Sequence, residues 1–80
     1  MEGSQFEWDP AKAAANFHKH KVQFREAATV FNDSNCIVHY DSVHSDKEDR
    51  AKAIGYSTRN RLLAVIYTVY DDATRIISAR

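Results

Sequence analysis

FREAATVFNDSNCIVHY, residues 24–40, contains the change of hydrophobic period that decides the fold class of this chain. Its first half has the i, i+3, i+4, i+7 spacing of one helix face. The residues at these positions are Phe24, Ala27, Ala28 and Phe31. Residues 36–40 follow with the composition of a strand. The segment therefore predicts a short helix over about 24–31, which ends near Asn32 and Asp33, and then a strand.

The segment before it predicts another strand and another helix. Phe6-Glu7-Trp8 alternates apolar, polar and apolar residues, and Asp9-Pro10 places an N-cap residue before a proline at the first helical position. The Ala-rich run to about Lys19 favours a helix. Its expected apolar face consists of Ala13, Ala14 and Phe17, with Trp8 placed to pack on Ala13. We expect the two helices to form a helical hairpin.

The second half of the chain predicts strands only. The expected strands are 50–56, 62–70 and 75–79. The segments between strands are polar or rich in turn residues, at 41–49, 57–60 and 71–74. Two helices with apolar stripes need a surface to pack on, and a meander of strands supplies one. The sequence therefore predicts a single domain over 1–80 with an α+β fold, in which the helical hairpin packs on an antiparallel sheet.

The stretch LLAVI, residues 62–66, is almost continuously apolar. This pattern indicates a central strand that is covered on both faces. The sequence shows no third helix for the second face, and it stops at Arg80, directly after a strand. We expect either a truncated C-terminal end or a face that is left for a partner.

Composition excludes several classes of protein. The chain has 80 residues, with 11 Lys and Arg against 11 Asp and Glu. A single Cys36 excludes an intramolecular disulfide framework, and the four His residues give no zinc-ligand spacing with it. No apolar run has the length of a membrane span, and the N-terminus does not have the pattern of a signal peptide. We expect a cytoplasmic protein.

A net charge of zero argues at first sight against a nucleic-acid binder, but the charges are segregated. The segments 10–25 and 50–70 contain no acid, and Arg75 and Arg80 lie near the end of the chain. The basic residues of the two segments are Lys12, Lys19, Lys21, Arg25, Arg50, Lys52, Arg59 and Arg61. The acids that cluster elsewhere include Asp41, Asp46, Glu48, Asp49, Asp71 and Asp72. The fold can therefore gather a basic face, although ordinary solvated charges give the same pattern.

Six ordered motifs carry a resemblance to a known family. They are Phe6-Glu7-Trp8-Asp9-Pro10-Ala11-Lys12, Asn16-x-x-Lys19-His20-x-Val22, Phe24-x-Glu26-Ala27, Ala53-Ile54-Gly55-x-Ser57, Arg61-Leu62-Leu63-x-Val65-x-Tyr67 and Arg75-Ile76-Ile77-Ser78-Ala79-Arg80. Over residues 6–80 the chain resembles the BrnT family, the ribonuclease toxins of type II BrnT/BrnA toxin-antitoxin systems. The resemblance implies a RelE-like fold of order β-α-α-β-β-β. The basic helix that usually follows in the family is absent from this sequence.

Three places depart from the family pattern. Lys21 stands where the family usually has Gly, so Lys21 must either adopt a positive φ, at a cost of about 1 kcal/mol, or end the first helix differently. Gln23 replaces a Ser at the N-cap of the second helix, which leaves Glu26 without a capping-box partner. Ala51 and Lys52 replace larger apolar residues, which predicts thinner packing on that strand.

The chemistry of an RNA-cleaving site can be met by residues of this chain. Attack by the ribose 2′-OH needs a base, an acid and positive groups around the phosphorane, and it needs no metal. His20 is flanked by two lysines, whose charge favours its neutral, basic form. Three arginines start or end strands of one sheet, where their fork-shaped donors can bind phosphate. The candidate catalytic residues are His20, Lys19, Arg61, Arg75 and Arg80, with no metal and no cofactor.

Each candidate also has a structural interpretation. A histidine in the last turn of a helix often stabilises the helix dipole. Arg61 and Arg75 lie next to turns, where arginines solvate strand ends, and Arg80 at a chain end can fray.

The resemblance implies partners as well. It implies a BrnA-type antitoxin that neutralises the toxin, an RNA substrate, and operator DNA bound only through the antitoxin. A face left uncovered predicts a homodimer when the antitoxin is missing. The main alternative is an inactive or truncated homologue that binds only the antitoxin, and a weaker one is a nucleic-acid-binding domain without catalysis.

Overall fold

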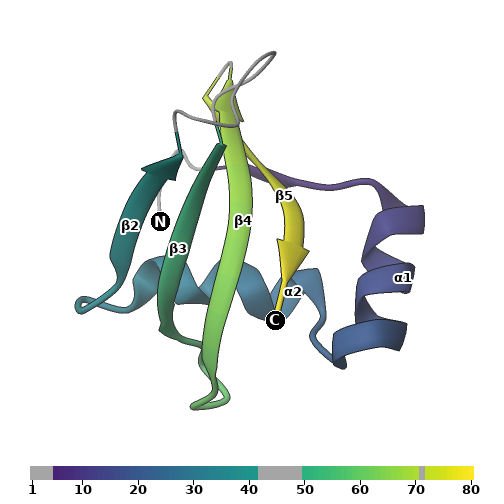
Figure 1. Ribbon diagram of the computed structural model, residues 1–80, viewed down its shortest axis with the longest axis horizontal. Coiled ribbons are helices and arrows are strands. Elements are labelled where there is room, and N and C mark those ends of the chain that lie inside the picture. Colours follow the sequence, from purple (N-terminus) through teal and green to yellow (C-terminus); the bar gives the residue numbers. More distant parts are fainter. Residues whose placement is uncertain (1–4, 42–49, 71) are drawn as a thin grey trace.

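The computed structural model describes residues 5–41, 50–70 and 72–80. Its elements, in chain order, are β1 (Gln5–Glu7), α1 (Pro10–His20), α2 (Phe24–Ala28), the 3₁₀ helix η1 (Thr29–Asn32), β2 (Ile37–Asp41), β3 (Arg50–Tyr56), β4 (Leu62–Tyr70) and β5 (Ala73–Ala79). The strands form one sheet in the order β1-β5-β4-β3-β2 (Figure 1). The predicted acidic cluster in the loop 41–49 lies, apart from the backbone of Asp41, outside the described residues.

The α+β class and the packing of helices on a sheet are confirmed. The sheet is mixed, however, and not purely antiparallel, because β1 pairs in parallel with β5, Phe6 opposite Thr74. The order β-α-α-β-β-β names one strand fewer than the structure contains, since four strands follow the helices. Strand β4 occupies the centre of the sheet, as its continuous apolar run predicts.

Helix α1 begins as the sequence predicts. The side chain of Asp9 accepts a hydrogen bond from the backbone N–H of Ala11 at 2.8 Å, and Pro10 occupies the first helical turn. The helix ends at Lys21, which has φ 61° and ψ 31°, and whose N–H bonds to Phe17 O. The first of the two alternatives for Lys21 is therefore correct. A non-glycine residue holds the left-handed conformation there.

The predicted apolar face of α1 is wrong in part. Phe17 and Ala14 are exposed, and the residue that the helix buries most deeply is Asn16. Its Nδ2 donates to Ala79 O at 2.9 Å and to Val22 O at 3.0 Å, and its Oδ1 accepts from Ala79 N at 3.0 Å. The Asn16 amide thus pairs with the edge of β5 as a neighbouring strand would, beyond the point where β1 ends.

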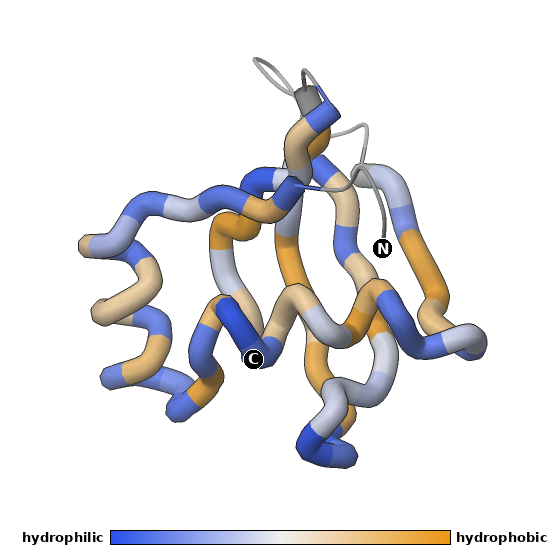
Figure 2. Tube along the Cα trace, turned by 180° about the vertical axis from the view of Figure 1, so that it is seen from behind, coloured by the Kyte–Doolittle hydropathy of each residue, from blue (hydrophilic) through white to orange (hydrophobic). Residues whose placement is uncertain are grey.

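Helix α2 is shorter than the predicted helix over 24–31, because its second half tightens into η1. Gln23 makes no side-chain capping bond, as expected. Phe24, Ala27 and Val30 point from this segment into the core. Figure 2 shows α2 and η1 crossing in front of the strands, whereas α1 lies beside the sheet at the β5 end, so the helical hairpin is open.

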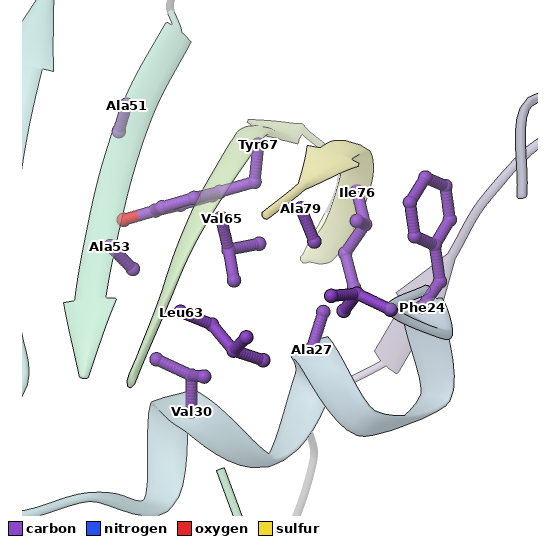
Figure 3. Packing of buried hydrophobic residues seen from close by; sticks show 11 residues of the cluster. Phe24, Ala27, Val30, Ala51, Ala53, Leu63, Val65, Tyr67, Ile76 and Ala79 are labelled. Carbon is purple, nitrogen blue, oxygen red and sulfur yellow. The ribbon is translucent and has the colours of Figure 1, made fainter. Parts of the chain in front are cut away.

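The core fills the space between the sheet and the α2–η1 segment (Figure 3). Its largest fully buried side chains are Phe24, Ile76, Val30 and Val65. Aromatic contacts extend it. Trp8 meets Phe24 edge-on with ring centroids 6.0 Å apart, and this contact, together with partly buried Ala13, closes the start of α1 over the core.

The opposite face of the sheet carries exposed apolar side chains. Leu62 is 59% exposed, Ile37 56% and Tyr56 53%, and α2 and η1 lie on the other side of the sheet. Leu62 lies opposite Tyr56 in the register. Within residues 5–41, 50–70 and 72–80, the expected cover on both faces of β4 is therefore present on one face only.

Candidate active site

The C-terminal end of β5 meets the last turn of α1. Ala79 is bonded to Asn16, and Arg80 follows it with its own backbone paired to Ala64. His20 lies four residues after Asn16, and so on the same face of α1, the face that points to β5. His20 is half-buried there, whereas His18 and Lys19 are exposed. This contact places His20 and Arg80 at one end of the sheet.

The turn between β3 and β4 lies at the same end. Arg61 Nη2 donates to Lys21 O at 3.1 Å, immediately after His20 in the chain. We call this region the basic end; it consists of Lys19, His20, Lys21, Arg59, Arg61 and Arg80. Four of the five residues predicted to be catalytic, all except Arg75, belong to it.

Arg75 lies at the other end of β5. It sits opposite Glu7 in the β1 register, and its Nε donates to Glu7 Oε2 at 2.9 Å. Arg80 lies five positions further along the chain, just after β5, which corresponds to about 15 Å of extended backbone. The Nε of Arg75 is bonded to Glu7, whereas Arg80 lies at the basic end, and the sequence does not show this difference because both arginines simply lie near strand ends.

Glu26 is the residue of this region that sequence reasoning missed. The sequence predicts for it only the role of a capping-box residue without a partner. Its carboxylate is nearly buried, and it accepts hydrogen bonds from Arg61 Nε at 2.9 Å, from Arg61 Nη2 at 2.5 Å and from the Ser57 hydroxyl at 2.7 Å. A signal was present in the sequence, since Glu26 lies between two apolar residues of a helix face, Phe24 and Ala27.

These contacts keep the carboxyl group of Glu26 ionised. The hydrogen bonds from Arg61 lower the pKa of Glu26 to about 2, against the opposing effect of burial, and the bond from Ser57 adds to them. The same ion pair raises the pKa of Arg61. Both side chains therefore remain charged over the whole physiological pH range.

The basic end can bind and polarise a phosphate group through its exposed cations, and His20 can exchange a proton with a bound group. No group of three or more His, Cys, Asp or Glu side chains with the geometry of a metal site occurs among the described residues. In the same residues, no helix has the length and apolar character needed to cross a membrane.

Comparison with known proteins agrees with this geometry. The fold matches the crystal structure of the ribonuclease toxin BrnT of Brucella abortus, with a TM-score of 0.67 and 25% sequence identity over 96% of this chain and 92% of that chain. A comparison with curated protein sequences gives no significant match. The family model for the ribonuclease toxin BrnT of type II toxin-antitoxin systems matches residues 8–80. The chain therefore belongs to the BrnT family of ribonuclease toxins.

Proposed function

We propose that this protein is an endoribonuclease that cuts RNA without a metal ion, through attack of the ribose 2′-OH, and thereby inhibits translation in the cytoplasm. The observation that carries this proposal is the basic end, where a half-buried histidine lies among exposed cations from three separate elements. Membership of a ribonuclease toxin family supports the same activity.

The proposed roles follow from the positions of the side chains. His20 takes the proton of the 2′-OH, because an imidazole is the side chain that most often serves as a general base and His20 is the one histidine of the basic end. Lys19 and Arg80 are exposed and stabilise the negative charge of the phosphorane. Arg61 faces the same end. Arg75 lies outside the basic end, is paired with Glu7, and binds a flanking phosphate of an extended RNA strand.

The test is cleavage of an end-labelled RNA by the purified protein in the presence of EDTA. We expect products with 2′,3′-cyclic phosphate and 5′-hydroxyl ends. His20→Ala should lower the rate by about 10²-fold or more, the scale for loss of a general base. His18→Ala is the matched control, since His18 is exposed on a different face of the same helix.

A folded wild-type protein that leaves RNA intact would contradict the proposal and favour the alternative, a homologue that binds only an antitoxin. The family implies an antitoxin partner, and we propose that it is of the BrnA type and carries the complex to operator DNA. Because the antitoxin binds the folded toxin and not the unfolded chain, adding it should raise the melting temperature of the toxin.

A further inference from the structure

The connection between α1 and α2 is held by two side chains, one from α1 and one from the turn between β3 and β4. Asn16 Nδ2 donates to Val22 O at 3.0 Å, and Arg61 Nη2 donates to Lys21 O at 3.1 Å. Lys21 itself has φ 61°, in the left-handed region that a side chain with a Cβ disfavours. The backbone conformation of the residues after His20 therefore depends on the hydrogen bonds from Asn16 and Arg61.

Arg61 is oriented before any substrate arrives. Its Nε and Nη2 contact the two oxygens of Glu26, whose side chain is only 5% exposed, whereas the side chain of Arg61 is 42% exposed. The charge of Glu26 offsets that of Arg61. A guanidinium fixed in this way has less attraction for a phosphate than an unpaired one, but it offers the Lys21 carbonyl a donor of constant direction.

We propose that Arg61 is a positioning residue, which holds Lys21 in its left-handed conformation and thereby sets the positions of His20 and Lys19. This proposal rests on the proposed function, because it concerns the same site. It differs from the phosphate-binding role that the sequence suggests for Arg61, in that Arg61 acts through the backbone at Lys21 and not on the RNA.

A double-mutant cycle tests the proposal. Gly adopts φ near 60° without strain, so Lys21→Gly should reduce the need for Arg61. We expect Arg61→Ala to lower kcat by about 10²-fold in the Lys21 protein, the scale for a misplaced catalytic group, with a small change in KM. In the Lys21→Gly background the same substitution should lower kcat by less than about tenfold.

The matched control is Asp72→Gly, which removes the same kind of strain at another residue with φ 63°. Asp72 lies in the turn immediately before β5, away from the basic end, and its substitution should leave the effect of Arg61→Ala unchanged. If Arg61→Ala does not fold, Arg61→Lys replaces it, because an ammonium keeps the charge but cannot bond Glu26 twice and also reach Lys21 O. Equal losses in both backgrounds, or a loss confined to KM, would overturn the proposal.

A second readout needs no catalysis. In the NMR spectrum, Arg61→Ala should shift the backbone amides of His20 and Lys21, and Lys21→Gly should reduce the shift at His20. If no variant cleaves RNA but this coupling is present, the proposed function fails and the positioning role stands. If RNA is cleaved and the His20 amide does not respond to Arg61→Ala, the positioning role fails alone.

Discussion

Arg61 and Glu26 join the turn after β3 to helix α2 through two hydrogen bonds, one to each oxygen of a carboxylate that is almost buried. Ser57, from the same turn, donates a third bond to this carboxylate. Because Arg61 also bonds Lys21 O, the pair connects the core-facing helix to the end of α1. A single buried charge therefore links the stability of the fold to the geometry of the basic end.

The first prediction concerns stability at low pH. The pKa of Glu26 is lowered from 4.5 to about 2 in the folded chain, so its ionised form favours folding fully above pH 4.5. This contribution is lost as the pH falls from about 5 to 2. We expect a loss of about 1–3 kcal/mol in the free energy of unfolding, below the full linkage value because Arg61 is partly exposed.

Urea unfolding of the wild type and of Glu26→Gln between about pH 2 and pH 7 measures the contribution of Glu26 to the free energy of unfolding. The two proteins should differ most near pH 7 and converge near pH 2. The pKa of Asp33 is also lowered, by hydrogen bonds from the backbone of Tyr56 and Asn35, so Glu26→Gln should retain part of the pH dependence. Parallel stability curves for the two proteins would contradict the role of Glu26.

The second prediction concerns Asn16. Its amide satisfies three backbone groups, and its removal leaves the N–H of Ala79 and the carbonyls of Ala79 and Val22 without this partner. Asn16→Ala should destabilise the fold by about 3 kcal/mol or more, since three buried groups lose their partner and each costs at least about 1 kcal/mol. Denaturant unfolding measures the change, with the exposed Asn32→Ala as control.

Asn16→Asp separates hydrogen bonding from shape. The carboxylate has nearly the same size, but it can donate to neither carbonyl. It should be at least as destabilising as Ala. A well-tolerated Asp at this position would show that the contact matters for packing and not for its hydrogen bonds.

The features that the sequence predicted correctly are local ones. The N-cap at Asp9 and the change of period after residue 31 depend on neighbouring residues, and capping and periodicity rules describe them, whereas the sequence left two alternatives for Lys21. The buried Asn16 broke the apolar stripe expected for α1, because its partner is an open strand edge 63 residues away. No pattern within a helix identifies that edge.

The candidate site shows the same limit. Strand ends were recognised, but which end of the sheet each arginine occupies depends on register, which local patterns leave open. Local patterns therefore group Arg75 with Arg80, although Arg75 lies where β1 pairs with β5 and Arg80 lies just after the other end of that strand. The Arg61–Glu26 pair spans 35 residues and required the packing of α2 against the turn after β3.

The third prediction concerns Gly55, at the point where β3 packs on η1. A Cβ there would lie 3.0 Å from Asp33 Oδ2, 3.1 Å from Val30 Cγ1 and 3.3 Å from Cys36 Cβ. Asp33 cannot move freely, because its Oδ2 accepts from the backbone N–H of Tyr56 at 2.8 Å. Gly55→Ala should therefore cost about 1–3 kcal/mol, the usual range for overpacking.

Thermal unfolding checks this value. Lys52→Ala on the same strand is a suitable control, since Lys52 is exposed and its side chain does not face η1. A melting temperature for Gly55→Ala equal to that of the wild type would mean that η1 can retreat from β3 at little cost.

The last prediction concerns the face of the sheet opposite the helices. Ile37 lies opposite Ile54, and Tyr56 lies opposite Leu62, so these four side chains share one face. Contiguous exposed apolar surface of this kind rarely stays uncovered in solution. Without an antitoxin, two copies of the chain should pair through this face, and we expect homodimers at micromolar concentration in sedimentation equilibrium.

A charged residue on this apolar face should prevent two copies of the chain from pairing through it. Leu62→Lys should shift the equilibrium to monomer while the folded state is retained, because Leu62 is 59% exposed and leaves no cavity when replaced. Val69→Lys is the matched control: Val69 is 57% exposed on the same strand, but its position relative to Leu63 and Val65 places it on the helix side. A wild-type chain that stays monomeric, or a Val69→Lys variant that dissociates as Leu62→Lys does, would mean that this face does not bind a second copy.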